Sequence, residues 1–235
     1  MKPNDRIGSY KLPVDTAAII SSIVYQKKDK LRASVFVAGE FAFGINVASV
    51  EQFRLRKGDE LTASLLEELS SVDDRISAKR TASKFLNARR RSEKEVVQKL
   101  KGEGFAEEII TEVTTSLITA GLINDEELAQ AFIHDKLLTK AASKRELENL
   151  LYKKGISKTT IATVLADQES DETELARKAA EKKWPTILRK ESDPRKRSQK
   201  LYAFLASRGF DQRTIKETVG KMSESEFSEF ENGTE

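Results

Sequence analysis

The chain has 235 residues and a formal net charge of +3, with 38% hydrophobic and 34% charged residues, which suffices for several small domains with apolar cores. It contains no cysteine, so disulfide frameworks, thiolate metal sites and cysteine nucleophiles are excluded. Only 11 glycines and 4 prolines interrupt the chain, and its apolar runs fall far short of the roughly 20 residues that span a bilayer. We therefore expect a mainly helical, soluble protein of the cytoplasm.

The first 70 residues predict a small α+β module. Residues 1–14 show no hydrophobic period, and we expect a loose arm there. Three segments then have the alternating pattern of strands and predict a three-stranded antiparallel sheet. A short helix around Val47, Val50 and Phe53 and a second helix over residues 61–69 would cover its apolar face. The strands are expected at residues 19–25, 31–37 and 41–45.

From residue 73 onward the apolar pattern has the helical period, and one helix ending occurs three times. In each copy a glycine follows four residues after a leucine, and a large apolar residue comes next. The copies are residues 100–105, 151–156 and 205–210, with offsets of 51 and 54 residues between their leucines. Such a glycine is typical of the left-handed C′ position of a Schellman motif.

The starts of the predicted helices repeat as well. Ser92 and Ser143, each with a glutamate three residues later, form capping boxes before the second helix of the first two repeats. Asn124 and Asp171 take the cap position before the first helix of repeats two and three. Each repeat is thus predicted to contain three helices, with a glycine turn between the second and the third.

The third repeat differs between its first two helices. Pro185 predicts that the first helix ends near Trp184, while Asp193, followed by a proline, predicts where the second begins. Residues 176 and 205 are 29 positions apart, against 18 and 22 for the equivalent pairs in repeats one and two. We interpret this difference as an insertion that lengthens the connection.

These patterns together predict a mainly α fold with three tandem three-helix repeats in an elongated, curved array, preceded by the α+β module. An acidic tail with five acidic and no basic residues follows the repeats. The expected domains are residues 1–70, 71–123, 124–169 and 170–222, with the tail at 223–235.

Catalytic groups are mostly missing from the sequence. His134 is the single histidine, so no histidine pair can hold a metal, and its helical context is typical of a structural or surface residue. No phosphate-binding loop of the P-loop type occurs. Paired acids such as Glu126 and Glu127 fall in first turns of helices, where they favour the helix dipole. We predict no enzyme, no catalytic residue, no metal and no cofactor.

Binding is the function that remains, because basic residues recur at matching places in the repeats. They provide either a solvated surface matched to helix C-termini or a contact with phosphates or acidic protein. Residues 177–200 add ten basic side chains against three acidic ones, and Trp184 and Tyr202 are the aromatics expected to be exposed. The candidate partner-binding residues are Arg89, Arg90, Arg91, Lys136, Lys140, Lys144 and Arg145.

Four stretches of the sequence match a known family when taken together. They are Ala82-x-x-Phe85-Leu86 and residues 91–96, 100–105 and 117–129. This set resembles the RecX family, whose members regulate the bacterial RecA recombinase, over residues 73–222. The family has Asp-Asp and a phenylalanine where this chain has Asn124-Asp125 and Leu128, changes that keep the cap and the apolar character. The first module resembles the N-terminal extension of longer members, through residues 41–44 and 55–61.

The resemblance implies three three-helix repeats that bind RecA and lodge in the groove of its filament on single-stranded DNA. Family members there depress strand exchange, ATP hydrolysis and the coprotease activity behind the SOS response. We expect a monomer, and no residue of a family motif transfers to the basic candidates named above. Two alternatives stay open: a helical repeat protein that binds DNA directly and competes for it, and an inert scaffold.

Overall fold

The computed structural model describes residues 6–13, 17–139, 142–166 and 171–232. The chain divides into two compact units. The first comprises Met1–Arg90 and Val96–Leu122, and the second comprises Arg91–Glu95 and Ile123–Glu235. The boundary between the units falls inside the helix Glu93–Gly102, because the first turn of this helix is assigned to the second unit.

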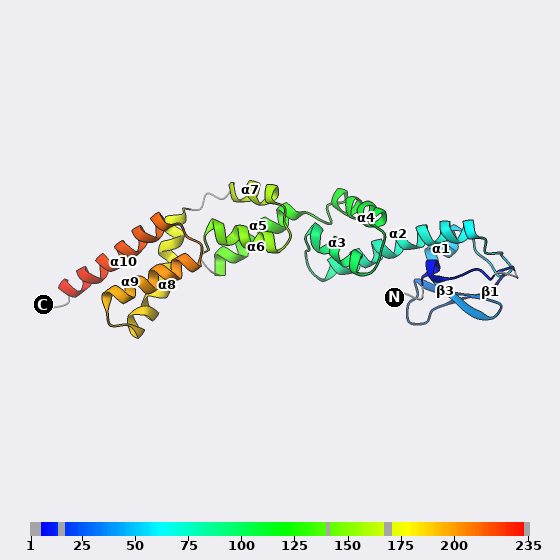
Figure 1. Cartoon of the computed structure of the whole chain (residues 1–235), viewed down its shortest axis with the longest axis horizontal. Helices are drawn as coiled ribbons and strands as arrows, with labels where there is room; N and C mark the ends of the chain where they lie inside the picture. Colours follow the sequence, from blue (N-terminus) through cyan, green and yellow to red (C-terminus); the bar gives the residue numbers. More distant parts are fainter. Residues whose placement is uncertain (1–5, 14–16, 140–141, 167–170, 233–235) are drawn as a thin grey trace. The chain divides into compact units, whose positions relative to one another are not determined.

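The first unit begins with the predicted antiparallel sheet, at the N-terminal end of the ribbon in Figure 1. Its strand order is β1-β2-β3. Ala38 and Gly39, at φ angles of 50° and 82°, form the tight turn between the second and third strands, a geometry that matches the strand twist. Ile7 is buried in a short 3-10 helix, η2, which differs from the loose arm expected for residues 1–14. The elements are η2 Ile7–Ser9, β1 Ile20–Tyr25, β2 Arg32–Val37 and β3 Glu40–Asn46.

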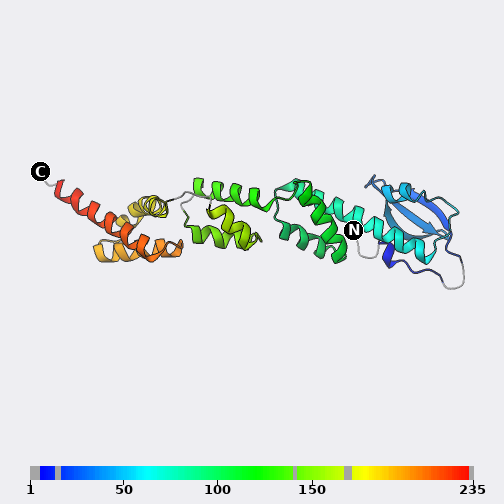
Figure 2. The same ribbon diagram turned by 90° about the horizontal axis from the view of Figure 1, so that it is seen from above.

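One face of the sheet forms the core of this module. Alternate strand residues such as Ala33, Val35 and Phe43 are fully buried, as the period of two requires. Two helices cover that face, α1 Val47–Gln52 and α2 Ala63–Ala88. Figure 2 shows the sheet with helical segments against it.

Helix α2 is a single helix of 26 residues, so the prediction of a separate helix over residues 61–69 was wrong. Asp73, where the helical period of the repeats was expected to begin, lies inside this helix, and its carboxylate is buried and bonded. Its Oδ1 accepts from the backbone N of Asn46 at 2.6 Å, from Asn46 Nδ2 at 2.9 Å and from Ser49 Oγ at 2.8 Å. Asp73 thereby satisfies the start of α1 and fastens α2 to the end of the sheet.

Helix α2 then continues as the first helix of repeat one, which completes the first unit (Figure 1). The other two helices are α3 Glu93–Gly102 and α4 Glu107–Thr119. Ala82, Leu100 and Ile110 from the three helices are buried, in agreement with the predicted apolar period.

The second unit holds the other two repeats, each with three helices as predicted. All three glycine turns have the predicted conformation: Gly104, Gly155 and Gly209 have φ angles of 79°, 91° and 81°. The residue after each glycine donates to the carbonyl of the leucine five positions before it, at 3.2–3.3 Å, which is the Schellman pattern. The helices are α5 Asp125–Thr139, α6 Lys144–Lys153, α7 Lys158–Ala166, α8 Glu172–Lys190, α9 Pro194–Ser207 and α10 Gln212–Asn232.

Two expectations for repeat three were wrong. Helix α8 runs through Pro185 to Lys190, so the additional residues lengthen the helix and not the connection. Trp184 is only 7% exposed and packs in the core of the repeat, together with Ile187 one turn later. This burial holds α8 together past the proline. The acidic residues 223–232 continue helix α10.

Serine N-caps join successive repeats within the second unit. Ser143 Oγ accepts from the backbone N–H three residues ahead and donates to the carbonyl of Arg208 at 2.7 Å. Ser92 Oγ makes the same pair of bonds, donating to the carbonyl of Lys154 at 2.7 Å. Lys154 and Arg208 each precede the glycine of a helix ending. One kind of joint is therefore used twice.

Candidate partner-binding surfaces

The arginine run Arg89, Arg90 and Arg91 follows the end of α2 and is divided between the units. Arg89, the C-cap residue, and Arg90 are exposed and belong to the first unit. Arg91 belongs to the second unit, and its Nη1 lies 3.4 Å from Glu95 Oε1, with a largely buried side chain. Arg91 therefore stabilises the start of α3, and the exposed charge of the run is that of Arg89 and Arg90.

The basic candidates of repeat two lie at the end of α5 and the start of α6. Lys136 is half-buried in the last turn of α5, and Lys140 lies outside the described residues. The backbone N of Lys144 donates to Glu172 Oε1 at 2.8 Å, which adds a second bond to the joint with repeat three. Arg145, the next residue, is exposed.

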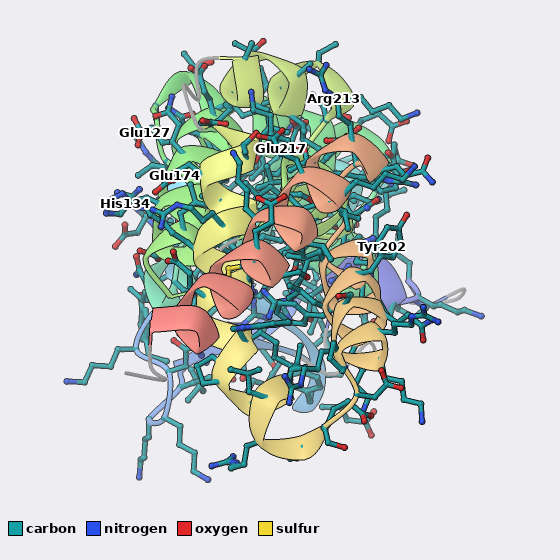
Figure 3. All side chains as sticks on the ribbon, turned by 90° about the vertical axis from the view of Figure 1, so that its left-hand side faces the viewer. Glu127, His134, Glu174, Tyr202, Arg213 and Glu217 are labelled. Carbon is teal, nitrogen blue, oxygen red and sulfur yellow. The ribbon has the colours of Figure 1, made fainter. Side chains whose placement is uncertain are left out.

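Arg145 lines a groove of about 620 Å³ between α6 and α9, which we call the repeat 2–3 groove. The sequence alone did not indicate that Lys153, Arg208 and Tyr202 line the same groove. Lys153 is exposed, and Tyr202 is half-exposed on α9 (Figure 3). Lys153 and Arg208 both lie in the recurring helix ending, two residues and one residue before its glycine, and this position was the signal that could have found them.

The contact between repeats two and three, at Ser143 and Arg208, shapes this groove. The bond from Ser143 to the carbonyl of Arg208 brings the Gly209 turn against the start of α6. A Cβ atom at Gly209 would lie 2.8 Å from Ser143 Oγ and 3.3 Å from the backbone N of Glu146, so only glycine allows this approach. The backbone thus holds Arg208 and Arg145 on the same groove.

The repeat 2–3 groove has more positive than negative groups. Its lining contains the cations of Arg145, Lys153 and Arg208, and its acidic member is Glu146. The Arg208 guanidinium lies 4.8 Å from the centre of the Phe204 ring, a cation–π contact that fixes its position. A groove with these groups can bind a carboxylate or a phosphate, with Tyr202 available for an apolar or hydrogen-bonding contact.

A second basic surface lies where α8 meets α9. Glu191, between the two helices, is paired with Lys200, whose Nζ lies 2.7 Å from its Oε2; this hydrogen bond lowers the pKa of the Glu191 carboxyl. Four exposed cations lie near the turn between α8 and α9. They are Arg189, Lys190, Arg195 and Lys196.

The remaining candidates for chemistry are few. His134 is exposed on α5 (Figure 3). In the parts of the chain that the structure describes, no three side chains of histidine, aspartate or glutamate gather into a group that could hold a metal ion. Within the same parts, no helix combines the length and apolar character needed to cross a membrane.

Four family models match the chain in order. The N-terminal domain of regulatory protein RecX matches residues 18–62. The first, second and third three-helix domains of RecX match residues 78–117, 124–165 and 169–219. The sheet module and each of the three repeats therefore have a counterpart in one family.

Individual relatives agree over most of their length. A regulatory protein RecX of Clostridium perfringens is 31% identical over 211 residues, covering 89% of this chain and 99% of that one. A regulatory protein RecX of Clostridioides difficile is 32% identical over 205 residues, covering 87% and 95%. A crystal structure of a regulatory protein RecX superposes with a TM-score of 0.64 at 28% identity, covering 86% and 98%. The chain belongs to the RecX family of regulatory proteins.

Proposed function

We propose that this protein is a non-enzymatic regulator that binds the RecA recombinase and its filament on single-stranded DNA. It acts in the cytoplasm as a monomer and inhibits or modulates the recombinase, ATPase and coprotease activities of RecA. Membership in the RecX family supports the regulatory role. The choice of RecA as the partner follows the resemblance of the sequence to that family.

The repeat 2–3 groove is the observation that carries this proposal. It combines three cations with a half-exposed tyrosine, and the Ser143–Arg208 bond fixes its two walls. Acidic side chains of a RecA subunit would pair with Arg145, Lys153 and Arg208, while Arg89 and Arg90 offer a further cationic contact. The partner-binding residues proposed from the sequence are Arg89, Arg90, Arg91, Lys136, Lys140, Lys144 and Arg145. The groove adds Lys153 and Arg208, while Arg91 and the backbone of Lys144 also bond within the chain.

The test is ATP hydrolysis by the host's RecA on single-stranded DNA while this protein is titrated in at two salt concentrations. DNA binding by the protein alone is measured beside it. We expect hydrolysis to fall at fewer than one protein per RecA subunit, in salt where the protein alone no longer binds DNA. Such substoichiometric loss means that the filament itself is the target.

A second candidate is direct competition for DNA, which the exposed cations Arg189, Lys190, Arg195 and Lys196 favour. Phosphate contacts make binding strongly salt-dependent, with a log–log slope of about 0.9 per neutralised phosphate on duplex DNA. If hydrolysis falls only in step with DNA coverage by this protein, competition is the mechanism and the RecA-binding proposal is wrong.

A further inference from the structure

The first unit contains a groove that the proposed function does not use, on the outer face of its sheet. Because Ala33 and Val35 point into the core, the alternate residues Ser34 and Phe36 of β2 face the other side. The groove has a volume of about 540 Å³ and is lined by strand residues and by Ser77–Lys84 of α2, beyond the first turns of that helix, which cover the core face. Gly44 of β3 pairs with Ser34 of β2 and contributes no side chain to the floor of the groove.

Four basic side chains line this sheet groove: Arg6, Arg32, Arg80 and Lys84. Its two acidic members are already neutralised. Arg80 Nη2 lies 2.8 Å from Asp29 Oδ1, and Lys99 Nζ lies 2.6 Å from Glu103 Oε1. These hydrogen bonds lower the pKa of both carboxyl groups, which keeps them ionised within their pairs. With Arg80 counted against Asp29, the lining keeps a net positive charge from Arg6, Arg32 and Lys84.

Two of the arginines are held in place by the fold. The Arg32 side chain is 11% exposed, and its Nη1 lies 3.9 Å from Oδ2 of the buried Asp73. Arg6 donates to the carbonyls of Glu103 and Gly104 at 2.5 and 2.9 Å and lies 4.4 Å from the centre of the Phe105 ring. A guanidinium has five N–H donors, so each arginine keeps donors for an anion without further ordering.

An exposed aromatic ring borders the same groove. Phe41 is 47% exposed, and its ring meets that of Phe36 edge to face, with centroids 6.0 Å apart. Phe41 also lines a second hollow of about 590 Å³, together with Lys11 and Lys57. The ring therefore lies between two hollows that both contain cations.

From this arrangement we propose that the sheet groove binds single-stranded nucleic acid, with a base stacked on Phe41 and neighbouring phosphates bound by Arg32, Arg80 and Lys84. Cations beside a partly exposed ring match a chain that carries phosphates and bases alternately. In a duplex the bases are already stacked, and an acidic peptide has no flat ring to offer Phe41. The site lies wholly in the first unit and does not depend on RecA binding.

The test is a fluorescence anisotropy titration of the full chain with labelled oligothymidylate at several salt concentrations, without RecA. Phe41→Ala is expected to weaken binding about tenfold, the size of one lost base stack, while Phe41→Tyr retains it. Lys84→Ala is expected to lower the salt slope by about 0.7, the value for one phosphate of a single strand. Circular dichroism confirms that each variant is folded.

Matched controls lie close at hand. Tyr152→Ala removes another exposed aromatic, and Lys79→Ala removes an exposed lysine of α2 outside the groove. Both are expected to bind like the unchanged chain. Unchanged binding by Phe41→Ala, equal affinity for a duplex of the same length, or equal competition by polyglutamate overturns the proposal. Since RecA is absent, none of these outcomes bears on the proposed regulatory function.

Discussion

The hydroxyl of Ser143 donates to the carbonyl of Arg208 over 2.7 Å while it accepts from the N–H of Glu146 at 3.1 Å. One side chain thereby caps α6 and ties it to the glycine turn of the following repeat. In repeat three the equivalent cap is Asp193, whose carboxylate accepts from the backbone of Arg195 and has no proton to donate. Asp193 therefore caps α9 without the second bond that Ser143 makes.

The joint predicts a stability effect of Ser143→Ala. The variant loses an N-cap and leaves the Arg208 carbonyl without its donor, so the free energy of unfolding of the second unit should fall by about 1–3 kcal/mol. Urea unfolding is followed by the fluorescence of Trp184, the single tryptophan, which is buried in repeat three. The transition is expected at lower urea concentration.

Ser157→Ala is the matched control. Ser157 caps α7, and its hydroxyl bonds to Thr159 and Thr160 of the same helix. Its loss should cost about 1 kcal/mol, the cap alone. Equal losses for the two serine variants would mean that the bond between repeats adds nothing.

The caps and glycine turns could be predicted from the sequence because they are local. The residues of a capping box are three positions apart, and a Schellman motif spans six residues. The joints could not be predicted, because Ser92 and Lys154 are 62 residues apart and Ser143 and Arg208 are 65 apart. Their hydroxyls were identified only as caps. The second bond of each appears once the repeats are packed together.

A second prediction concerns the proline inside α8. Pro185 has no N–H to donate to the carbonyl one turn earlier, which costs about 3 kcal/mol in a helix interior. Helix α8 nevertheless continues, since Trp184 and Ile187 pack in the core of repeat three. Pro185→Ala should therefore raise the free energy of unfolding by about 1–3 kcal/mol, measured by Trp184 fluorescence.

Lys182→Ala, at an exposed position of the preceding turn, is the control and should change stability by less than about 0.5 kcal/mol. A destabilised Pro185→Ala would contradict the argument, because it would mean that the repeat requires the distortion that proline introduces. This site also shows a limit of sequence rules. Proline usually ends a helix, but here the burial of Trp184 and Ile187 in the core of the repeat outweighs that local preference.

A third prediction concerns Asp73, the buried carboxylate in the first unit. Asp73→Ala leaves the backbone N–H of Asn46 and the hydroxyl of Ser49 without their acceptor, and leaves Arg32 without its partner. Asn46 Nδ2 also loses one bond but keeps the one to Ser77 Oγ. The expected loss is on the order of 3–5 kcal/mol in the first unit. Urea unfolding should show an earlier transition by circular dichroism, while the Trp184 transition in the second unit stays in place.

For the neighbouring residue, Asp74→Ala, we expect the opposite change in the free energy of unfolding. Burial raises the pKa of Asp74, so its charged form is disfavoured in the folded state. Removing the carboxylate should leave stability unchanged or higher at pH 7, and the difference from the unchanged chain should shrink as the pH falls through the raised pKa. A large loss at pH 7 would show that Asp74 makes a favourable interaction of its own.

The candidate surfaces could be predicted only in part. Arg145 was singled out because basic residues recur at matching places in the repeats, and it lines the repeat 2–3 groove; whether it binds a partner stays a prediction. Lys144 and Arg91 share that pattern, but their positions serve local structure: the backbone of Lys144 bonds Glu172, and Arg91 pairs with Glu95. Charge and repeat position indicate where cations gather. Which of them face a common groove depends on how α6 and α9 pack.

The last prediction tests the repeat 2–3 groove through the double variant Arg145→Glu with Lys153→Glu. Both side chains are exposed, so the fold should be retained, while the sign of the charge in the groove is reversed. Like charges facing an acidic RecA surface cost several kcal/mol, so half-inhibition of RecA ATP hydrolysis should require at least about tenfold more protein. The charge reversal Lys158→Glu, at an exposed lysine of α7 outside the groove, should leave inhibition near its original value. If the double variant and the control inhibit alike, acidic contacts in this groove do not hold the partner, and Arg89 and Arg90 become the residues to reverse next.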